Sequence, residues 1–391
     1  MISTFASSPE QVVAALSAGA DHLIFEHSRL TIRSFYNDDN DLTFTKYLTL
    51  SSLAQSILPT VKRSVSIDIL PHNEDLPVIE SAIYAATRAD IHAFRIQDIG
   101  VASLIREIDP TAEITLAPEI GYHSARAIRI ALRHVDRMCV GNEVSVSTLR
   151  ALADCTDRLE TQVQGPIMIQ YSYRRYLDGV IHNASTYDRQ VSDTEYPGRR
   201  VRFFDSPNGT IMFLYFDRCL LRELTHLNEL NLGAWLVDCR GESSDYLTTA
   251  ISTYLQIEDG HLVDIPTVVS ILHQLSGRPQ RPGFFLQNNT DQDRDRPLAN
   301  RDVLAVVRDA VKGKYLMVEF RESIPALPSH FSIITSKGEF KDVTQLEFKD
   351  PISLQVVLSV STGDLLLTQW ISGVAPKSLF LSNIQQGGRV I

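Results

Sequence analysis

The sequence lacks most features that mark secreted, membrane-spanning or nucleic-acid-coating proteins. It has four cysteines in 391 residues, without a C-x-x-C pair, so we expect small buried side chains there and no disulfide framework. No apolar run is long enough to span a bilayer and the start has no basic segment, so we expect a cytoplasmic protein with no membrane partner. The formal charge of −10 provides no global attraction to nucleic acid, so any such contact must be local.

Several local signatures of catalysis or cofactor binding are also missing. The sequence contains no H-E-x-x-H zinc motif, no G-x-S-x-G elbow, no phosphate loop and no G-x-G-x-x-G fingerprint. It therefore predicts no metal ligand set, and a function must be inferred from the arrangement of residues that are distant in sequence.

The sequence does contain a strong strand–helix alternation. Seven short apolar runs before residue 245 each end on a polar or charged side chain, and a helix-like stretch follows most of them. Repeated units of this kind, with polar carboxyl ends, are typical of a (β/α) barrel, whose sites form at those ends. The predicted strands are Met1–Phe5, Asp21–Phe25, Ser66–Leu70, Phe94–Ile96, Ile114–Pro118, Met138–Gly141 and Trp235–Val237.

The predicted helices follow the same units. Ser8 to Gln11 has the form of a capping box with proline at the first helical position, and Gly19 closes that helix. Apolar spacing and stop signals predict the others at Ser51–Val61, Leu76–Ala89, Val101–Ile108, His123–Val135, Ser147–Cys155, Asp217–Leu230, Ser244–Leu255 and Pro266–Leu275.

The alternation breaks after Tyr171, and this sets the domain boundaries. We assign residues 1–277 to a TIM-like α/β barrel with an irregular segment and hairpin inserted at about 173–216, the hairpin strands being Val201–Phe204 and Thr210–Phe216. A polar linker at 278–302 leads to a C-terminal β-domain at 303–391, a small barrel or sandwich. Its predicted strands are Val303–Val311, Lys314–Phe320, His330–Ile334, Thr344–Phe348, Leu354–Val360 and Leu365–Ile371.

An acidic rim is the main candidate for chemistry. Crowded carboxylates would raise one another's proton affinity or attract a divalent cation, although helix caps or ion pairs would explain the same residues. Arg240 shares a strand face with Asp238 and could clamp a substrate carboxylate or phosphate, or form an ion pair with Asp238 or Glu143. The rim acids are Glu26, Asp68, Asp98, Glu119, Glu143 and Asp238.

From these positions we select candidate site residues. The catalytic candidates are Glu143, Asp238 and Glu119. The substrate-binding candidates are Arg240, Gln97, Asp98, His72 and Tyr171, of which Tyr171 begins an aromatic and arginine-rich stretch that could stack on an RNA base.

Several segments occur in the order found in a known family. They are Ser7–Gln11, Ala18–Asp21, Leu70–Glu74, Ile96–Gly100, Gly141–Ser145, Ala234–Tyr246 and Pro282–Leu286. Together they resemble the collagenase-like peptidase family U32 over most of residues 1–290. The resemblance implies a barrel, and better-understood members support hydroxylation of transfer RNA, ribosomal RNA or ubiquinone precursors. Many members carry an iron–sulfur cluster, and those with a C-terminal β-module resemble the RNA branch.

The chain departs from the family at the cluster ligands. The family pattern His-Gly-x-x-Cys-x-x-Tyr-Ser-x-x-Cys is met here by Gln164 for the histidine, Met168 for the first cysteine and Arg175 for the second. Thiolates are the usual ligands of such clusters. We therefore predict no iron–sulfur cluster and no other cofactor.

Three functions remain open. The leading hypothesis is a member of the RNA-hydroxylation type, or the clusterless partner of a cluster-bearing paralogue, that binds a small anionic metabolite or an RNA nucleotide at the barrel mouth. The second is a metal-dependent peptidase or hydrolase. The third is a non-catalytic scaffold or binding protein, so whether the chain is an enzyme stays open.

Overall fold

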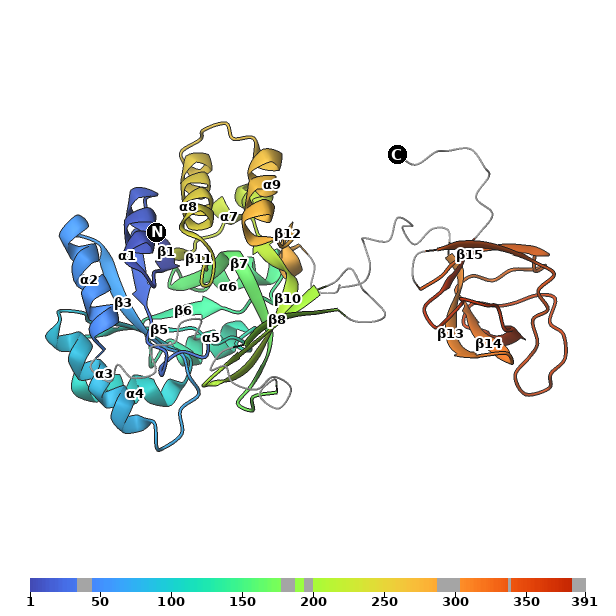
Figure 1. Cartoon of the computed structure of the whole chain (residues 1–391), viewed down its shortest axis with the longest axis horizontal. Coiled ribbons are helices and arrows are strands. Elements are labelled where there is room, and N and C mark those ends of the chain that lie inside the picture. The colour runs from blue at the N-terminus through green and yellow to red at the C-terminus, as the bar shows by residue number, and fades with distance from the viewer. Residues whose placement is uncertain (34–43, 177–186, 193–199, 287–302, 337–338, 382–391) are drawn as a thin grey trace. The chain divides into compact units, whose positions relative to one another are not determined.

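The computed structural model describes residues 1–33, 44–176, 187–192, 200–286, 303–336 and 339–381. They form two compact units that divide near residue 290, a (β/α) barrel and an antiparallel sheet. Figure 1 shows both units.

Eight parallel strands close the barrel. They run in the order β11, β1, β2, β3, β4, β5, β6, β7, and β11 pairs with both β1 and β7, which completes the ring. This confirms the predicted fold class. The strands are β1 (Ile2–Phe5), β2 (His22–Phe25), β3 (Lys62–Ile67), β4 (Ala93–Ile96), β5 (Glu113–Leu116), β6 (Arg137–Val140), β7 (Leu159–Ser172) and β11 (Ala234–Val237).

The seventh barrel strand, β7, is missing from the sequence prediction. Its side chains Glu160, Gln162 and Gln164 are polar and buried, so the segment lacks the apolar run that marks the other strands. Polar contacts satisfy them: Glu160 accepts a 2.5 Å hydrogen bond from Arg95 of β4. The strand was therefore recognisable only with its partners in place.

Helices cover the outer side of the strands (Figure 1). The predicted N-cap of the first helix is confirmed, because the Ser8 hydroxyl accepts from the Gln11 amide at 3.2 Å. The return bond of a capping box is displaced by one residue, since the Gln11 side chain accepts from the Ser7 amide at 2.9 Å. The helices are α1 (Pro9–Ser17), α2 (Thr45–Ile57), α3 (Leu76–Arg88), α4 (Ile99–Ile108), α5 (Ala125–Ala131), α6 (Val146–Ala153), α7 (Leu224–Asn228), α8 (Ser244–Glu258) and α9 (Ile265–Ser276). None of the helices in these described ranges is long and apolar enough to cross a membrane.

A β-extension grows from β7. Beyond the barrel, β7 pairs with β10 (Gly209–Cys219), which pairs with β9 (Arg200–Ser206), and β9 pairs with β8 (Tyr187–Ser192). The predicted hairpin is confirmed. The helix predicted from Asp217 is wrong at its start, because β10 continues to Cys219 and pairs with the short β12 (Gln280–Arg281) before helical turns begin at Leu221.

The C-terminal unit is a curled sheet of six antiparallel strands. Aromatic side chains fill its core, including Phe320, Phe331, Phe348 and Phe380. The strands predicted at Thr344–Phe348 and Leu354–Val360 are wrong, since β16 ends at Thr344 and the second stretch makes isolated bridges. The strands, in sheet order, are β16 (Phe340–Thr344), β15 (His330–Ile334), β18 (Leu379–Leu381), β13 (Val303–Val311), β14 (Tyr315–Phe320) and β17 (Leu365–Gln369).

Close packing of β7 against the end of β11 requires a glycine. Gly165 has φ +115°, and a Cβ there would lie 1.9 Å from the Asp238 carbonyl oxygen. The Asp238 amide also donates to the Gln164 carbonyl at 2.9 Å. The backbone at Asp238 is therefore fixed by direct contact with β7.

This contact gives a stability prediction. We expect Gly165→Ala to destabilise the chain more than Gly260→Ala, which also has positive φ (+83°) but open space at its Cβ. Left-handed strain alone costs roughly 1–2 kcal/mol, and the clash at Gly165 should add about 2–3 kcal/mol. Denaturant unfolding of both variants measures the difference. An equal decrease in the free energy of unfolding of both variants would contradict a close contact between Gly165 and Asp238.

Candidate functional site

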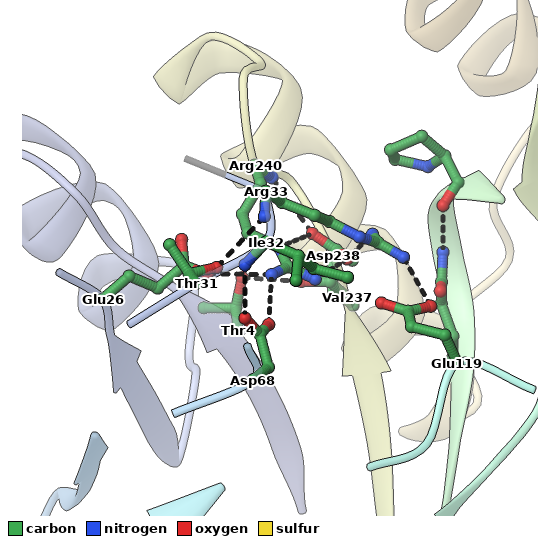
Figure 2. A network of polar contacts seen from close by, with 12 residues as sticks. Thr4, Glu26, Thr31, Ile32, Arg33, Asp68, Glu119, Val237, Asp238 and Arg240 are labelled. Carbon is green, nitrogen blue, oxygen red and sulfur yellow. Dashed lines mark hydrogen bonds and ion pairs between the residues drawn. The ribbon is translucent and has the colours of Figure 1, made fainter. Parts of the chain in front are cut away.

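Four carboxylates meet at the carboxyl ends of the barrel strands, the barrel mouth. Each lies within three residues of the end of its strand: β2, β3, β5 and β11. Parallel strands bring these ends to one rim, which is why acids distant in sequence become neighbours. We call them the mouth carboxylates: Glu26, Asp68, Glu119 and Asp238, all labelled in Figure 2.

Arg240 binds three of the mouth carboxylates at once. Its Nε and Nη2 donate to the two oxygens of Asp238 at 2.9 and 2.7 Å, and Nη1 donates to Glu26 at 2.8 Å and Asp68 at 3.3 Å. Its guanidinium lies 3.8 Å from the ring centre of Phe5. Arg240 is therefore a buried structural cation that joins β11 to β2 and β3.

A loop after β2 also contacts the mouth carboxylates. The Thr31 hydroxyl donates to Glu26 at 2.9 Å, and the Ile32 amide donates to Asp68 at 2.9 Å. The side-chain amide of Asn208, at the hairpin turn between β9 and β10, holds the loop by donating to the Thr31 carbonyl at 2.6 Å. The β-extension thus fixes the loop over the mouth.

Arg33, in the same loop, completes the network. Its Nη1 donates to Asp238 at 2.7 Å and its Nη2 to Glu119 at 2.7 Å, and the side chain is 1% exposed (Figure 2). Its guanidinium lies 5.3 Å from the centre of the Phe213 ring. One planar group with two donors therefore bridges two carboxylates from strands that are not neighbours in the ring, β5 and β11.

The network separates the proton affinities of its acids. Burial, opposed by Arg240 and reinforced by Asp68, raises the pKa of Glu26 to about 7. Burial also acts on Asp238, but Arg240 and Arg33 outweigh it and lower the pKa of Asp238 to about 2. Two carboxyl groups with such different proton affinities are suited to distinct acid–base roles at neutral pH.

The mouth is almost filled by its own side chains. The cavity beside Asp238 and Arg240 has a volume of about 30 Å³, room for one or two water molecules at roughly 10–15 Å³ each. Arg95, Cys139, Asn142 and Gln162 also line it. A larger ligand would have to displace Arg33 and its loop.

The residues at the family's cluster positions do not fit an iron–sulfur cluster. Gln164 is buried and its amide donates to the Tyr246 hydroxyl at 2.6 Å and to the Gln280 side chain at 2.7 Å. Met168 packs in the apolar core. Within the described ranges, no three His, Cys, Asp or Glu side chains are grouped to hold a metal ion.

The structure brings together three of the eight predicted site residues: Glu119, Asp238 and Arg240. Glu143 is exposed and lines a separate cavity of about 470 Å³ with His123. Asp98 caps α4 by accepting from the Gly100 amide at 2.6 Å, and Gln97 beside it is half-buried.

The two remaining predicted residues, His72 and Tyr171, lie in other contacts. His72 is exposed, with its ring 4.9 Å from that of Tyr173. The Tyr171 hydroxyl donates to the Asn208 carbonyl at 2.6 Å, and burial raises the pKa of Tyr171 to about 12. His72 therefore belongs to the loop after β3, and Tyr171 to the part of β7 that pairs with the β-extension.

Sequence analysis missed Arg33. It does not follow a strand directly, and no local motif marks it. Its partners Glu119 and Asp238 are 86 and 205 residues away in the chain.

Comparisons with known proteins find similar sequences over most of this chain. The family model Peptidase family U32 matches residues 7–295. The tRNA hydroxylation protein P1 of Bacillus subtilis (strain 168) is 20% identical over 271 residues, covering 65% of this chain and 62% of that protein. The Collagenase of Porphyromonas gingivalis (strain ATCC BAA-308 / W83) is 24% identical over 188 residues, covering 45% and 44%. Each match thus spans less than two thirds of the relative's own length.

Among solved structures, phosphoribosyl anthranilate isomerase of Thermotoga maritima matches with a TM-score of 0.36 and 11% identity. That match covers 66% of this chain and 98% of the isomerase.

The ion pairs of Arg240 predict a large stability effect. Arg240→Met leaves Glu26, Asp68 and Asp238 without their shared cation, and breaking a buried pair in this way costs roughly 3–5 kcal/mol. Arg150→Met is the control, because Arg150 makes an exposed 2.7 Å ion pair with Glu229 worth about 1 kcal/mol or less. Denaturant unfolding compares them. Wild-type stability in Arg240→Met would contradict a structural role.

The raised pKa of Glu26 predicts a pH effect on stability. The folded state holds this proton more tightly than the unfolded chain, so folding favours the protonated form. The free energy of unfolding therefore falls as pH rises from 4.5, the ordinary pKa of a glutamate, through about 7. Glu26→Gln has the shape of the protonated glutamate but cannot titrate, so the variant should not lose stability over this pH range. The gap between variant and wild type should widen by about 3 kcal/mol from pH 4 to 8, measured by denaturant unfolding. A constant gap would contradict the raised pKa.

Proposed function

The chain belongs to peptidase family U32, and from that premise we propose that it acts in RNA modification of the tRNA-hydroxylation type, binding an RNA nucleotide at the barrel mouth. The observation that carries this proposal is the set of mouth carboxylates gathered around Arg240. The relative named tRNA hydroxylation protein P1 supports the class of reaction.

The contacts of Arg33 indicate which group the mouth can recognise. Its two nitrogens donate to Asp238 and Glu119, each at 2.7 Å. A nucleobase edge with N–H groups presents similar donors on a planar frame. When the loop moves away, such an edge could take over these oxygens, with Glu26 available to exchange a proton near neutral pH.

Arg240 is a poor direct ligand for an anion in this arrangement. Three carboxylates already surround its guanidinium, and a fourth negative group would meet their repulsion. This favours an RNA base over a small anionic metabolite at this position of the mouth.

A redox step would need chemistry that the family cluster normally supplies. Gln164, Met168 and Arg175 replace its ligands. Gln164 is hydrogen-bonded to Tyr246, and Met168 packs in the apolar core. We therefore place that step on a cluster-bearing paralogue, with this chain contributing the RNA site.

The test is the modified-nucleoside profile of a strain without this gene, measured by mass spectrometry of its tRNA and rRNA. We expect at least one hydroxylated nucleoside to disappear, and the wild-type gene to restore it. Glu119→Gln should restore less than a tenth, because it removes a charged acceptor at the mouth while keeping the shape. The matched control Glu229→Gln, in an exposed ion pair with Arg150, should restore it fully.

An unchanged profile would contradict the proposal. Chelator-sensitive cleavage of peptides by the purified protein, together with an unchanged profile, would favour the hydrolase alternative. An altered profile without co-purification of a cluster-bearing paralogue would contradict the partner assignment alone.

A further inference from the structure

Arg218 differs from the other buried arginines of this chain. Six arginines are buried in the described ranges, and five have a carboxylate oxygen at 3.9 Å or less. Arg218, on β10, is 0% exposed and has no carboxylate partner among the described residues. The five paired arginines are Arg33, Arg95, Arg202, Arg240 and Arg278.

The donors left over in Arg218 form a binding fork. In Arg278 the Nε and Nη2 atoms donate side by side to Asp217 at 2.7 and 3.1 Å, and Arg240 holds Asp238 in the same way. In Arg218 these same two atoms are buried without a hydrogen-bond partner in the described part of the chain. This edge of a guanidinium matches the spacing of two oxygens of a carboxylate or phosphate.

The remaining nitrogen of Arg218 points to the barrel mouth. Nη1 donates to the Asn142 side-chain oxygen at 2.6 Å, and the Asn142 amide donates to Gln162 at 2.8 Å. Asn142 and Gln162 both line the mouth cavity. Arg218 therefore lies directly behind one wall of the site.

Keeping this charge unpaired is unfavourable for folding. Burial lowers the pKa of Arg218 to about 10, and no nearby carboxylate opposes that effect. A buried charge without a partner costs several kcal/mol, whereas an apolar side chain of similar volume would not. A destabilising group next to a site is a candidate for ligand binding.

We propose that the Nε/Nη2 fork of Arg218 binds an anionic oxygen group of the ligand, a phosphate or a carboxylate, beside Asn142. This rests on the proposed function, in which the mouth recognises the base and Arg218 holds the negative group of the same ligand. It assigns the anion-binding role to Arg218 and leaves Arg240 as a structural cation.

The surroundings of Arg218 offer a route for the anion. The Phe285 ring lies 5.6 Å from its guanidinium, in a 3-10 turn (η2, Gly283–Phe285). The neighbouring Phe284 lines the outer cavity of about 470 Å³ together with Glu143 and His123. A shift of this turn would remove Phe285 from the guanidinium and give an anion a way in from that cavity. The Glu143 carboxylate there is exposed, so water and salt screen its repulsion.

The experiment measures thermal unfolding of the full chain against inorganic phosphate and, separately, acetate, at constant ionic strength with chloride. Wild type should be stabilised saturably by one of the two anions, with Tm rising by about 2 °C or more. Arg218→Met should have a higher Tm than wild type without the anion, because it removes the unpaired charge, and should show no anion response. A stronger effect of phosphate indicates a nucleotide phosphate, and a stronger effect of acetate a metabolite carboxylate.

A second variant keeps the test valid if Arg218→Met does not fold. Asn142→Asp places a carboxylate 2.6 Å from Nη1, which supplies the missing counter-charge with almost no change of shape. We expect at least a tenfold weaker anion response, whereas the Tm without the anion also reflects loss of the hydrogen bond that the Asn142 amide donates to Gln162 at 2.8 Å. Arg150→Met, at an exposed ion pair, should respond like wild type.

Three results would overturn the proposal: no saturable response of wild type to either anion, a wild-type response in Arg218→Met or Asn142→Asp, or a lower anion-free Tm of a folded Arg218→Met. Anion binding that depends on Arg218, together with an unchanged nucleoside profile of the deletion strain, would retain this site and contradict the proposed function. A changed nucleoside profile together with no anion binding that depends on Arg218 would contradict this site and retain the proposed function.

Discussion

The ion pair between Arg240 and Asp238 is the contact on which the rest of the barrel mouth depends. It joins two residues of one strand end, and the same guanidinium reaches Glu26 after β2 and Asp68 after β3. Because all of these groups are buried, none can lose its partner without a large cost. The mouth is therefore a single electrostatic unit, in which a change at one acid alters the others.

Two contacts from segments distant in sequence support this unit. Gly165 lets β7 pass close to the Asp238 carbonyl. Asn208 of the β-extension donates to the Thr31 carbonyl and so holds the loop whose donors reach the mouth carboxylates. The β-extension thus holds the loop whose Thr31, Ile32 and Arg33 occupy the mouth.

The sequence predicted the parts of this arrangement that local patterns encode. Strand–helix periodicity identified the barrel, and the acid after each apolar run placed Glu119 and Asp238 at the mouth. It failed at β7, where Glu160 and its neighbours face inward and hide the strand, and it could not find Arg33. Such residues acquire their role from partners across the ring, and one sequence does not display those pairings. The rim acid Asp98 proved to be a helix cap, a local role that the sequence analysis had left open for these acids.

The contrast between two arginines links the electrostatics to ligand recognition. Arg240 is surrounded by carboxylates, so its positive charge is neutralised within the protein. Arg218 is equally buried, yet its neighbour is the neutral amide of Asn142, which orients the guanidinium without cancelling its charge. A carboxylate at that position would pair with the guanidinium and remove the attraction for an anion. An amide there is therefore what a site needs if its counter-charge arrives with the ligand. In the proposals above, the group behind the Asn142–Gln162 wall binds negative charge, and Glu119 and Asp238 bind the N–H donors.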